Sequence, residues 1–142
     1  IDPDQLITYK YNTENSYYAP YVNKNLTGYA VDRKLNGVGY ILFTEPVTEI
    51  SGPLFSDDQS YVTEITLPES LTTIGNRAFD ECYNLKTLYI KSSTPPTISG
   101  DDYLFYYISY LPSSSCSKYP LAILISPVLG STFLPSIYPL DS

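Results

Sequence analysis

The fold follows from residues 62–90, which read VTEITLPESLTTIGNRAFDECYNLKTLYI, because their apolar positions recur elsewhere in the chain. The pair Ile65 and Leu67 recurs about 24 residues earlier and about 23 residues later, as Ile41 with Phe43 and as Leu88 with Ile90. Self-similarity with a period of about 20 to 50 residues is the sequence signature of repeat architectures. The stretch therefore predicts parallel strands that lie one repeat apart.

The segments between these strands repeat as well. Three apolar anchors recur in the same order, as Val47, Ile50 and Phe55 and again as Leu71, Ile74 and Phe79. A brief helix near residues 76–82, with Asn76 as its N-cap, is expected before the next strand. We expect the apolar repeat positions to form the core, namely Ile50, Phe55, Ile65, Leu67, Ile74, Phe79, Leu85, Leu88 and Ile90.

Residues 65–90 resemble the BspA-type leucine-rich repeat proteins, which are found on the surfaces of gut and oral Bacteroides-like bacteria and of some parasitic protists. They match the pattern I-x-L-P-x-S-[VL]-T-x-I-G-x-x-A-F-x-x-C-x-x-L-x-x-[LI]-x-I at nearly every defined position, including Cys82. Residues 37–50 look like the first strand of that family, and residues 93–98 look like the prolines after its last repeat. The resemblance covers roughly residues 6 to 98. It implies a non-catalytic, secreted or surface-displayed module of the adhesion type, which binds a protein or glycan partner.

The chain of 142 residues is expected to form one domain, since one ordinary core suffices for this length. The expected fold is a strand-rich α/β leucine-rich repeat solenoid with short helices, an N-terminal β-hairpin cap and a divergent C-terminal cap. We place the cap and hairpin at residues 1–38, the repeats at 39–98 and the C-terminal cap or interface at 99–142.

Two features predict the N-terminal cap. Segments 28–34 and 38–44 flank Asn36-Gly37, a dipeptide typical of two-residue hairpin turns. Residues 6–11 alternate in polarity and predict a strand, with Ile7, Tyr9 and Tyr11 on its buried face. A terminal repeat needs such a cap because it otherwise exposes its hydrophobic face.

We find no further copy of the repeat after Ile98. Residues 103–111 are strongly apolar, and residues 121–125 are strand-like. Three interpretations of this tail stay open: a divergent cap, an interface for a partner or homo-oligomer through residues 103–125, and a segment whose reading frame has shifted. The large apolar and aromatic residues at 103–111 should be covered on both sides, by the last repeat and by residues 121–125 or another chain.

Composition excludes several functions. The net charge of -7 and the pI near 4.3 argue against nucleic-acid binding, which needs clustered lysine and arginine. The chain has no histidine, so Ser-His-Asp, Cys-His and imidazole metal sites are absent, and we expect no cofactor, no metal and no enzyme. A pair of carboxylates suited to glycoside hydrolysis stays open among the fifteen acidic residues, although no pair stands out. No apolar run is long enough to span a membrane.

The two cysteines are too few for a disulfide-built scaffold. We expect Cys82 to be buried at its apolar repeat position, and the alternative is a disulfide with Cys116.

The period of two in the strands predicts a candidate binding face. If strands centred at Leu42, Thr66 and Tyr89 are parallel neighbours in that order, their outward residues form a ladder. This ladder is Tyr40, Leu42, Thr44, Glu64, Thr66, Thr87, Tyr89 and Lys91. The sixteen tyrosines suit recognition, because tyrosine combines an apolar ring with a hydroxyl. The alternative function is a structural or assembly subunit, of a surface layer or a phage virion, that oligomerises through the apolar tail.

Overall fold

The computed structural model describes residues 2–14, 20–56, 61–75, 77–79, 82, 85–93, 96–98 and 122–125. Within them lie one short 3-10 helix, η1 at Pro3–Gln5, and nine strands. The strands are β1 (Leu6–Tyr11), β2 (Tyr29–Leu35), β3 (Val38–Phe43), β4 (Glu49–Ile50), β5 (Val62–Leu67), β6 (Thr73–Ile74), β7 (Thr87–Ile90), β8 (Thr97–Ile98) and β9 (Ala122–Ile125).

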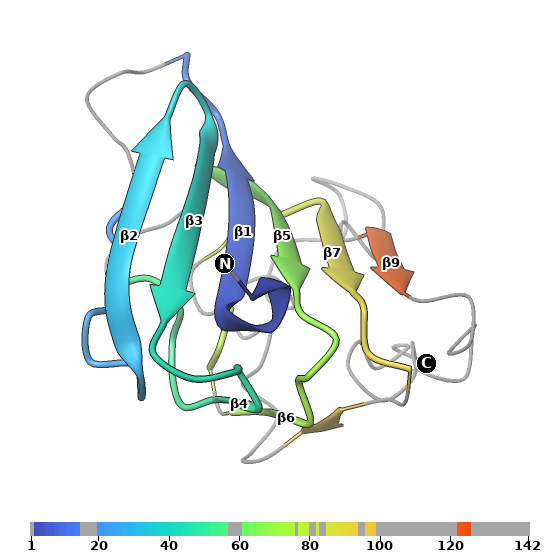
Figure 1. Cartoon of the computed structure of the whole chain (residues 1–142). Coiled ribbons are helices and arrows are strands. Elements are labelled where there is room, and N and C mark those ends of the chain that lie inside the picture. The colour runs from blue at the N-terminus through green and yellow to red at the C-terminus, as the bar shows by residue number, and fades with distance from the viewer. Residues whose placement is uncertain are drawn as a thin grey trace.

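The strands form two sheets. Six of them lie side by side in the order β2-β3-β1-β5-β7-β9, as Figure 1 shows, and β4, β6 and β8 form the second sheet. In the larger sheet the pairs β2–β3, β3–β1 and β1–β5 are antiparallel, whereas the pairs β5–β7 and β7–β9 are parallel. The chain from β3 to β9 passes from one sheet to the other at every step.

The predicted order of the central strands was wrong in one respect. β5 and β7 are parallel neighbours, with Thr66 paired to Tyr89, but β3 does not lie beside β5. β1 lies between them and pairs antiparallel with both, so that Thr8 faces Tyr40 on one side and Thr66 on the other. The physical reason is that a strand with an apolar face and unpaired backbone groups fits any open edge, and β1 occupies the one beside β5.

Hydrogen bonds that Asp4 accepts from two successive repeats hold the start of β1 against them. The Val47 amide donates to the Asp4 carbonyl at 2.7 Å, and the Ser70 amide donates to the Asp4 carboxylate at 3.3 Å. The Ser70 hydroxyl donates to the Val47 carbonyl at 2.7 Å. Ser70 therefore ties its own repeat both to the preceding one and to the N-terminal segment.

The second sheet keeps the predicted period without interruption. Ile50 pairs with Ile74, and Ile74 pairs with Ile98, all in parallel. The Gly75 amide donates to the Ile50 carbonyl at 2.8 Å, and a Cβ at Gly75 would lie 2.2 Å from that oxygen. Only glycine fits this close approach, which explains the Ile-Gly pair of the repeat pattern.

The parallel ladder continues beyond Ile98, where the sequence predicts no further copy of the repeat. Residues 121–125 were predicted to be strand-like, and β9 is indeed a strand, paired in parallel with β7. Ile123 pairs with Leu88 and Ile125 with Ile90, so the spacing of the two isoleucines reproduces the strand pattern of the repeats.

The hairpin prediction is confirmed. β2 and β3 are joined at Asn36 and Gly37, whose φ angles of 52° and 88° are those of a type I′ turn. In β1, Ile7 and Tyr9 are buried as predicted, and Tyr11 is half-buried. The Tyr9 ring lies over Gly39, where a Cβ would come within 2.3 Å of it.

All nine residues predicted to form the core are buried, and so is Cys82. The predicted helix near residues 76–82 is a turn at residues 77–79. Predictions on Asn76, Cys116 and residues 103–120 lie outside the described residues.

Candidate functional site

The candidate site is the side of the six-stranded sheet that does not pack on the core. Because side chains alternate along a strand, every second residue of β1, β3 and β7 points to this side, and so does every second residue of β2 from Val31 and of β5 from Glu64, where the pairing is regular. Each of these residues is exposed or half-buried. We call this surface the outward face. It consists of Leu6, Thr8, Lys10, Val31, Arg33, Leu35, Val38, Tyr40, Leu42, Glu64, Thr66, Thr87 and Tyr89.

Strand register arranges these side chains in rows across the sheet. One row runs from Arg33 in β2 through Tyr40, Thr8 and Thr66 to Tyr89 in β7. Neighbouring strands lie about 4.8 Å apart, so the row is continuous from strand to strand.

A second row runs parallel to the first. It runs from Leu35 through Val38, Lys10 and Glu64 to Thr87. The two rows together place polar side chains in the middle of the face and apolar side chains towards its β2–β3 end.

The structure places the predicted ladder residues only partly as expected. Glu64 lies beside Thr87 and Thr66 beside Tyr89, as predicted. The other predicted neighbours are separated, because β1 adds Leu6, Thr8 and Lys10 between the β3 residues and the β5 residues.

The other four predicted ladder residues lie on β3 or beyond the ends of the strands. Tyr40 and Leu42 are half-buried on β3. Thr44 and Lys91 are exposed, but they follow the last residues of β3 and β7 and so lie beyond the strands.

Sequence reasoning missed the apolar residues at the hairpin tip. Leu35 is 74% exposed and Val38 is 54% exposed, and the two pair across the turn. Tyr89, at the other end of the face, is 37% exposed. The sequence signal for Leu35 and Val38 was their position directly on either side of Asn36-Gly37, with Val38 two residues before Tyr40 and so on the same face of the strand.

An ion pair crosses the middle of the outward face. The Lys10 ammonium lies 3.8 Å from the Glu64 carboxylate, and the two side chains are 61% and 34% exposed. An exposed pair at this distance contributes little to stability, about 0 to 1 kcal/mol.

A second polar cluster lies on the inner side of β2. The Tyr29 hydroxyl donates to the Asp32 carboxylate, and Lys34 lies 3.9 Å from that carboxylate. The hydrogen bond to Asp32 raises the pKa of Tyr29. The hydroxyl of Tyr9 is buried and has no hydrogen-bond partner among the residues that the structure describes. Burial, followed by the charge of Asp32, raises the pKa of Tyr9.

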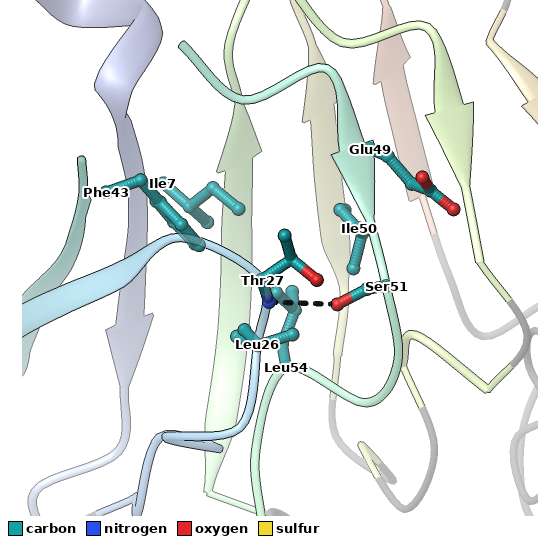
Figure 2. A pocket seen from close by; sticks show the side chains of 8 residues that line it. All are labelled: Ile7, Leu26, Thr27, Phe43, Glu49, Ile50, Ser51 and Leu54. Atoms are coloured by element: carbon teal, nitrogen blue, oxygen red, sulfur yellow. Dashed lines mark hydrogen bonds between the residues drawn. The ribbon is translucent and has the colours of Figure 1, made fainter. Parts of the chain in front are cut away.

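A small recess lies where the loop before β2 approaches β4 (Figure 2). The Thr27 amide donates to the Ser51 hydroxyl across it at 3.1 Å, and Figure 2 shows the Glu49 carboxylate pointing away. The recess does not admit a water molecule, so it is a packing defect and not a ligand site. Its lining is Ile7, Leu26, Thr27, Phe43, Glu49, Ile50, Ser51 and Leu54.

The described residues contain no cluster of three acidic, cysteine or histidine side chains that could hold a metal ion. Among them, no helix is long and apolar enough to cross a membrane.

A family model described as the BspA type leucine-rich repeat region matches residues 33–123, with six copies. The match begins inside β2 and therefore leaves out β1. No curated protein and no solved structure matches the chain.

Proposed function

The chain belongs to the BspA-type leucine-rich repeat family, and on this premise we propose that it is a non-catalytic module that binds a protein partner through the outward face. Membership supports a repeat module for protein interaction. A secreted or surface-displayed location, and a role in adhesion, are part of the same proposal.

The observation that carries the proposal is the row from Arg33 to Tyr89. It offers a cation, two tyrosines and two threonines on adjacent strands of a continuous sheet. The opposite side of these strands packs in the core, where Ile7, Ile41 and Ile65 are buried, and so cannot contact a partner. Surface complementarity on a rigid sheet needs no catalytic group.

A protein suits this face better than a glycan. The exposed residues at its β2–β3 end, Leu35 and Val38, are aliphatic. Aliphatic side chains gain most from burial against other apolar groups, whereas a sugar hydroxyl buried against them loses its hydrogen bonds to water.

The experiment compares variants of the face on immobilised extracellular-matrix proteins and on a glycan array. Tyr89→Ala and Thr66→Arg should each weaken binding to a protein at least about tenfold, because one removes an aromatic contact and the other fills the centre of the face. Tyr21→Ala is the matched control, since Tyr21 is 64% exposed and lies outside the outward face.

Three results would contradict the proposal. They are binding to glycans in place of proteins, an equal loss with Tyr21→Ala, or no bound protein in the panel. Circular dichroism of each variant shows that the fold is retained.

A further inference from the structure

The outward face differs in charge from the rest of the molecule. The chain as a whole carries a net charge of -7. On the outward face, among the strand residues that the structure describes, Lys10 and Arg33 stand against the single carboxylate of Glu64. The face is therefore locally cationic in an acidic protein, which is the charge contrast expected at a surface selected for an acidic partner.

The two cations lie on either side of an apolar strip. Lys10 in β1 pairs with Val38, and Arg33 in β2 pairs with Tyr40, so that Val38 and Tyr40 on β3 separate them. Leu35 extends the strip beyond Val38. A partner that reached both cations would have to cover these apolar side chains as well.

Both cations keep the capacity to bind a carboxylate of a partner, in spite of their contacts within the chain. Lys10 is 61% exposed and its distance of 3.8 Å to Glu64 is long for an ion pair, so its ammonium can turn to another carboxylate. One guanidinium nitrogen of Arg33 donates to the Asp32 carbonyl at 2.9 Å. Arginine has five N–H donors, so this bond leaves the fork able to take a carboxylate in bidentate geometry.

We propose that the partner docks through an acidic protein segment that places carboxylates on Lys10 and Arg33 and apolar side chains on Leu35, Val38 and Tyr40. This proposal rests on the proposed function and names the chemistry of the partner. The apolar strip distinguishes such a segment from an anionic polysaccharide, which could neutralise the cations but could not bury the aliphatic side chains.

The proposal also assigns a role to β1. Lys10 comes from a strand that precedes the family-matched residues 33–123, and it lies in the middle of the face only because β1 separates β3 from β5. The repeats supply the sheet, and the N-terminal strand supplies one of the two charges that select the partner.

The test uses a short soluble labelled peptide in which glutamates and leucines are separated by serines. Its counterpart with lysines in place of the glutamates and a sulfated polysaccharide are the comparison ligands. The acidic peptide should bind the full chain more tightly than the other two, and its affinity should fall as salt is raised, because exposed charges are screened.

Charge-reversal variants locate the contact. Lys10→Glu and Arg33→Glu should each weaken binding of the acidic peptide at least about tenfold. Lys24→Glu, at an exposed position outside the outward face, should change it less than about twofold. Lys10→Gln removes the charge without placing a second carboxylate beside Glu64 and should show the same direction with a retained fold.

The proposal is overturned if no acidic peptide binds, if the lysine peptide or the polysaccharide binds as tightly, or if Lys24→Glu has the same effect. Its failure is distinguishable from failure of the proposed function. If Tyr89→Ala and Thr66→Arg abolish binding to a matrix protein while Lys10→Glu and Arg33→Glu do not, the face binds a protein but does not select an acidic one.

Discussion

Strands that lie one repeat apart in the sequence are paired in one sheet and separated in the other. In the three-stranded sheet β4 pairs directly with β6, and in the six-stranded sheet β1 separates β3 from β5. The residues of both sheets obey one offset, since Ile50 precedes Ile74 by the same number of residues as Phe43 precedes Leu67. A regular sequence period therefore specifies which side chains are buried but not which strands are neighbours.

The contact that defines each arrangement also differs in kind. In the small sheet Gly75 approaches the backbone carbonyl of Ile50, whereas in the large sheet Gly39 approaches the end of the Tyr9 side chain. A backbone contact cannot be relieved by a change of rotamer, and a side-chain contact can.

The largest effect is expected at the core that the sheets share. Phe79 is fully buried in the same cluster as Ile65 and Ile74. Phe79→Ala should lower the free energy of unfolding by about 3 to 5 kcal/mol, through lost burial and a residual cavity. Denaturant melts should still show one transition, and a loss below about 1 kcal/mol would contradict the register assigned to this repeat.

The two glycines separate backbone from side-chain contacts. Gly75→Ala should lower the free energy of unfolding by about 2 to 3 kcal/mol, because its Cβ would lie 2.2 Å from the Ile50 carbonyl oxygen, which cannot move away. Gly39→Ala should cost less, about 1 to 2 kcal/mol, because the end of the Tyr9 side chain can shift away from the new Cβ. In a double-mutant cycle of denaturant melts, Tyr9→Leu should reduce the stability loss caused by Gly39→Ala and should leave the loss caused by Gly75→Ala unchanged. Rescue of both, or of neither, would show that the sheets are defined in the same way.

Ser70 tests how firmly β1 is tied to the repeats. Ser70→Ala removes the hydroxyl that donates to the Val47 carbonyl at 2.7 Å and lies 3.4 Å from the Asp4 carbonyl of the N-terminal segment, and it should cost about 1 kcal/mol. Thr72→Val removes the exposed hydrogen bond from Thr72 to the Thr48 carbonyl and is the matched control, with an expected loss below about 0.5 kcal/mol. Equal losses would mean that the N-terminal segment adds nothing at this point.

Tyr9→Phe should be stabilising by up to about 1 kcal/mol. Within the part of the chain that the structure describes, the buried Tyr9 hydroxyl has no hydrogen-bond partner, so its removal ends a desolvation penalty and leaves the ring packed over Gly39. Thermal melts at neutral pH measure the gain. A clear destabilisation would show that a water molecule or another group satisfies the hydroxyl.

The smallest effect is expected in alkaline solution. Because burial raises the pKa of Tyr9, the folded chain holds this proton at a pH where the unfolded chain loses it. The free energy of unfolding should keep its full contribution from Tyr9 below about pH 10, the ordinary pKa of tyrosine, and should fall as the pH rises above that value. Tyr9→Phe should show a shallower loss, and parallel pH profiles of the two proteins would contradict this assignment.

The sequence predicted the local features well where one residue type satisfies one physical demand. Asn36-Gly37 supplies two positive φ angles, so the hairpin was predictable, and Gly75 follows Ile74 because a side chain would not fit. The continuation of the ladder at β9 was less apparent, because Ile123 and Ile125 repeat the strand pattern after a much longer interval than the other repeats.

The candidate site was only partly predictable. The pairs Glu64 with Thr87 and Thr66 with Tyr89 follow from the repeat offset. Lys10 could not be assigned to the same surface from its position in the sequence, because it comes from the N-terminal strand, far from Glu64 along the chain.

The period, the buried residues, the hairpin and the absence of histidine chemistry follow from the amino-acid sequence alone, because each depends on side-chain identity at a given position. The tertiary structure decided that β1 lies between β3 and β5, and with it the composition of the outward face. The reason is that strand pairing joins backbone groups, which are alike in every residue except proline. Several strand orders can therefore satisfy the same hydrogen bonds, and the packing of Ile7 and Tyr9 and the bonds of Asp4 favour the order that the structure shows.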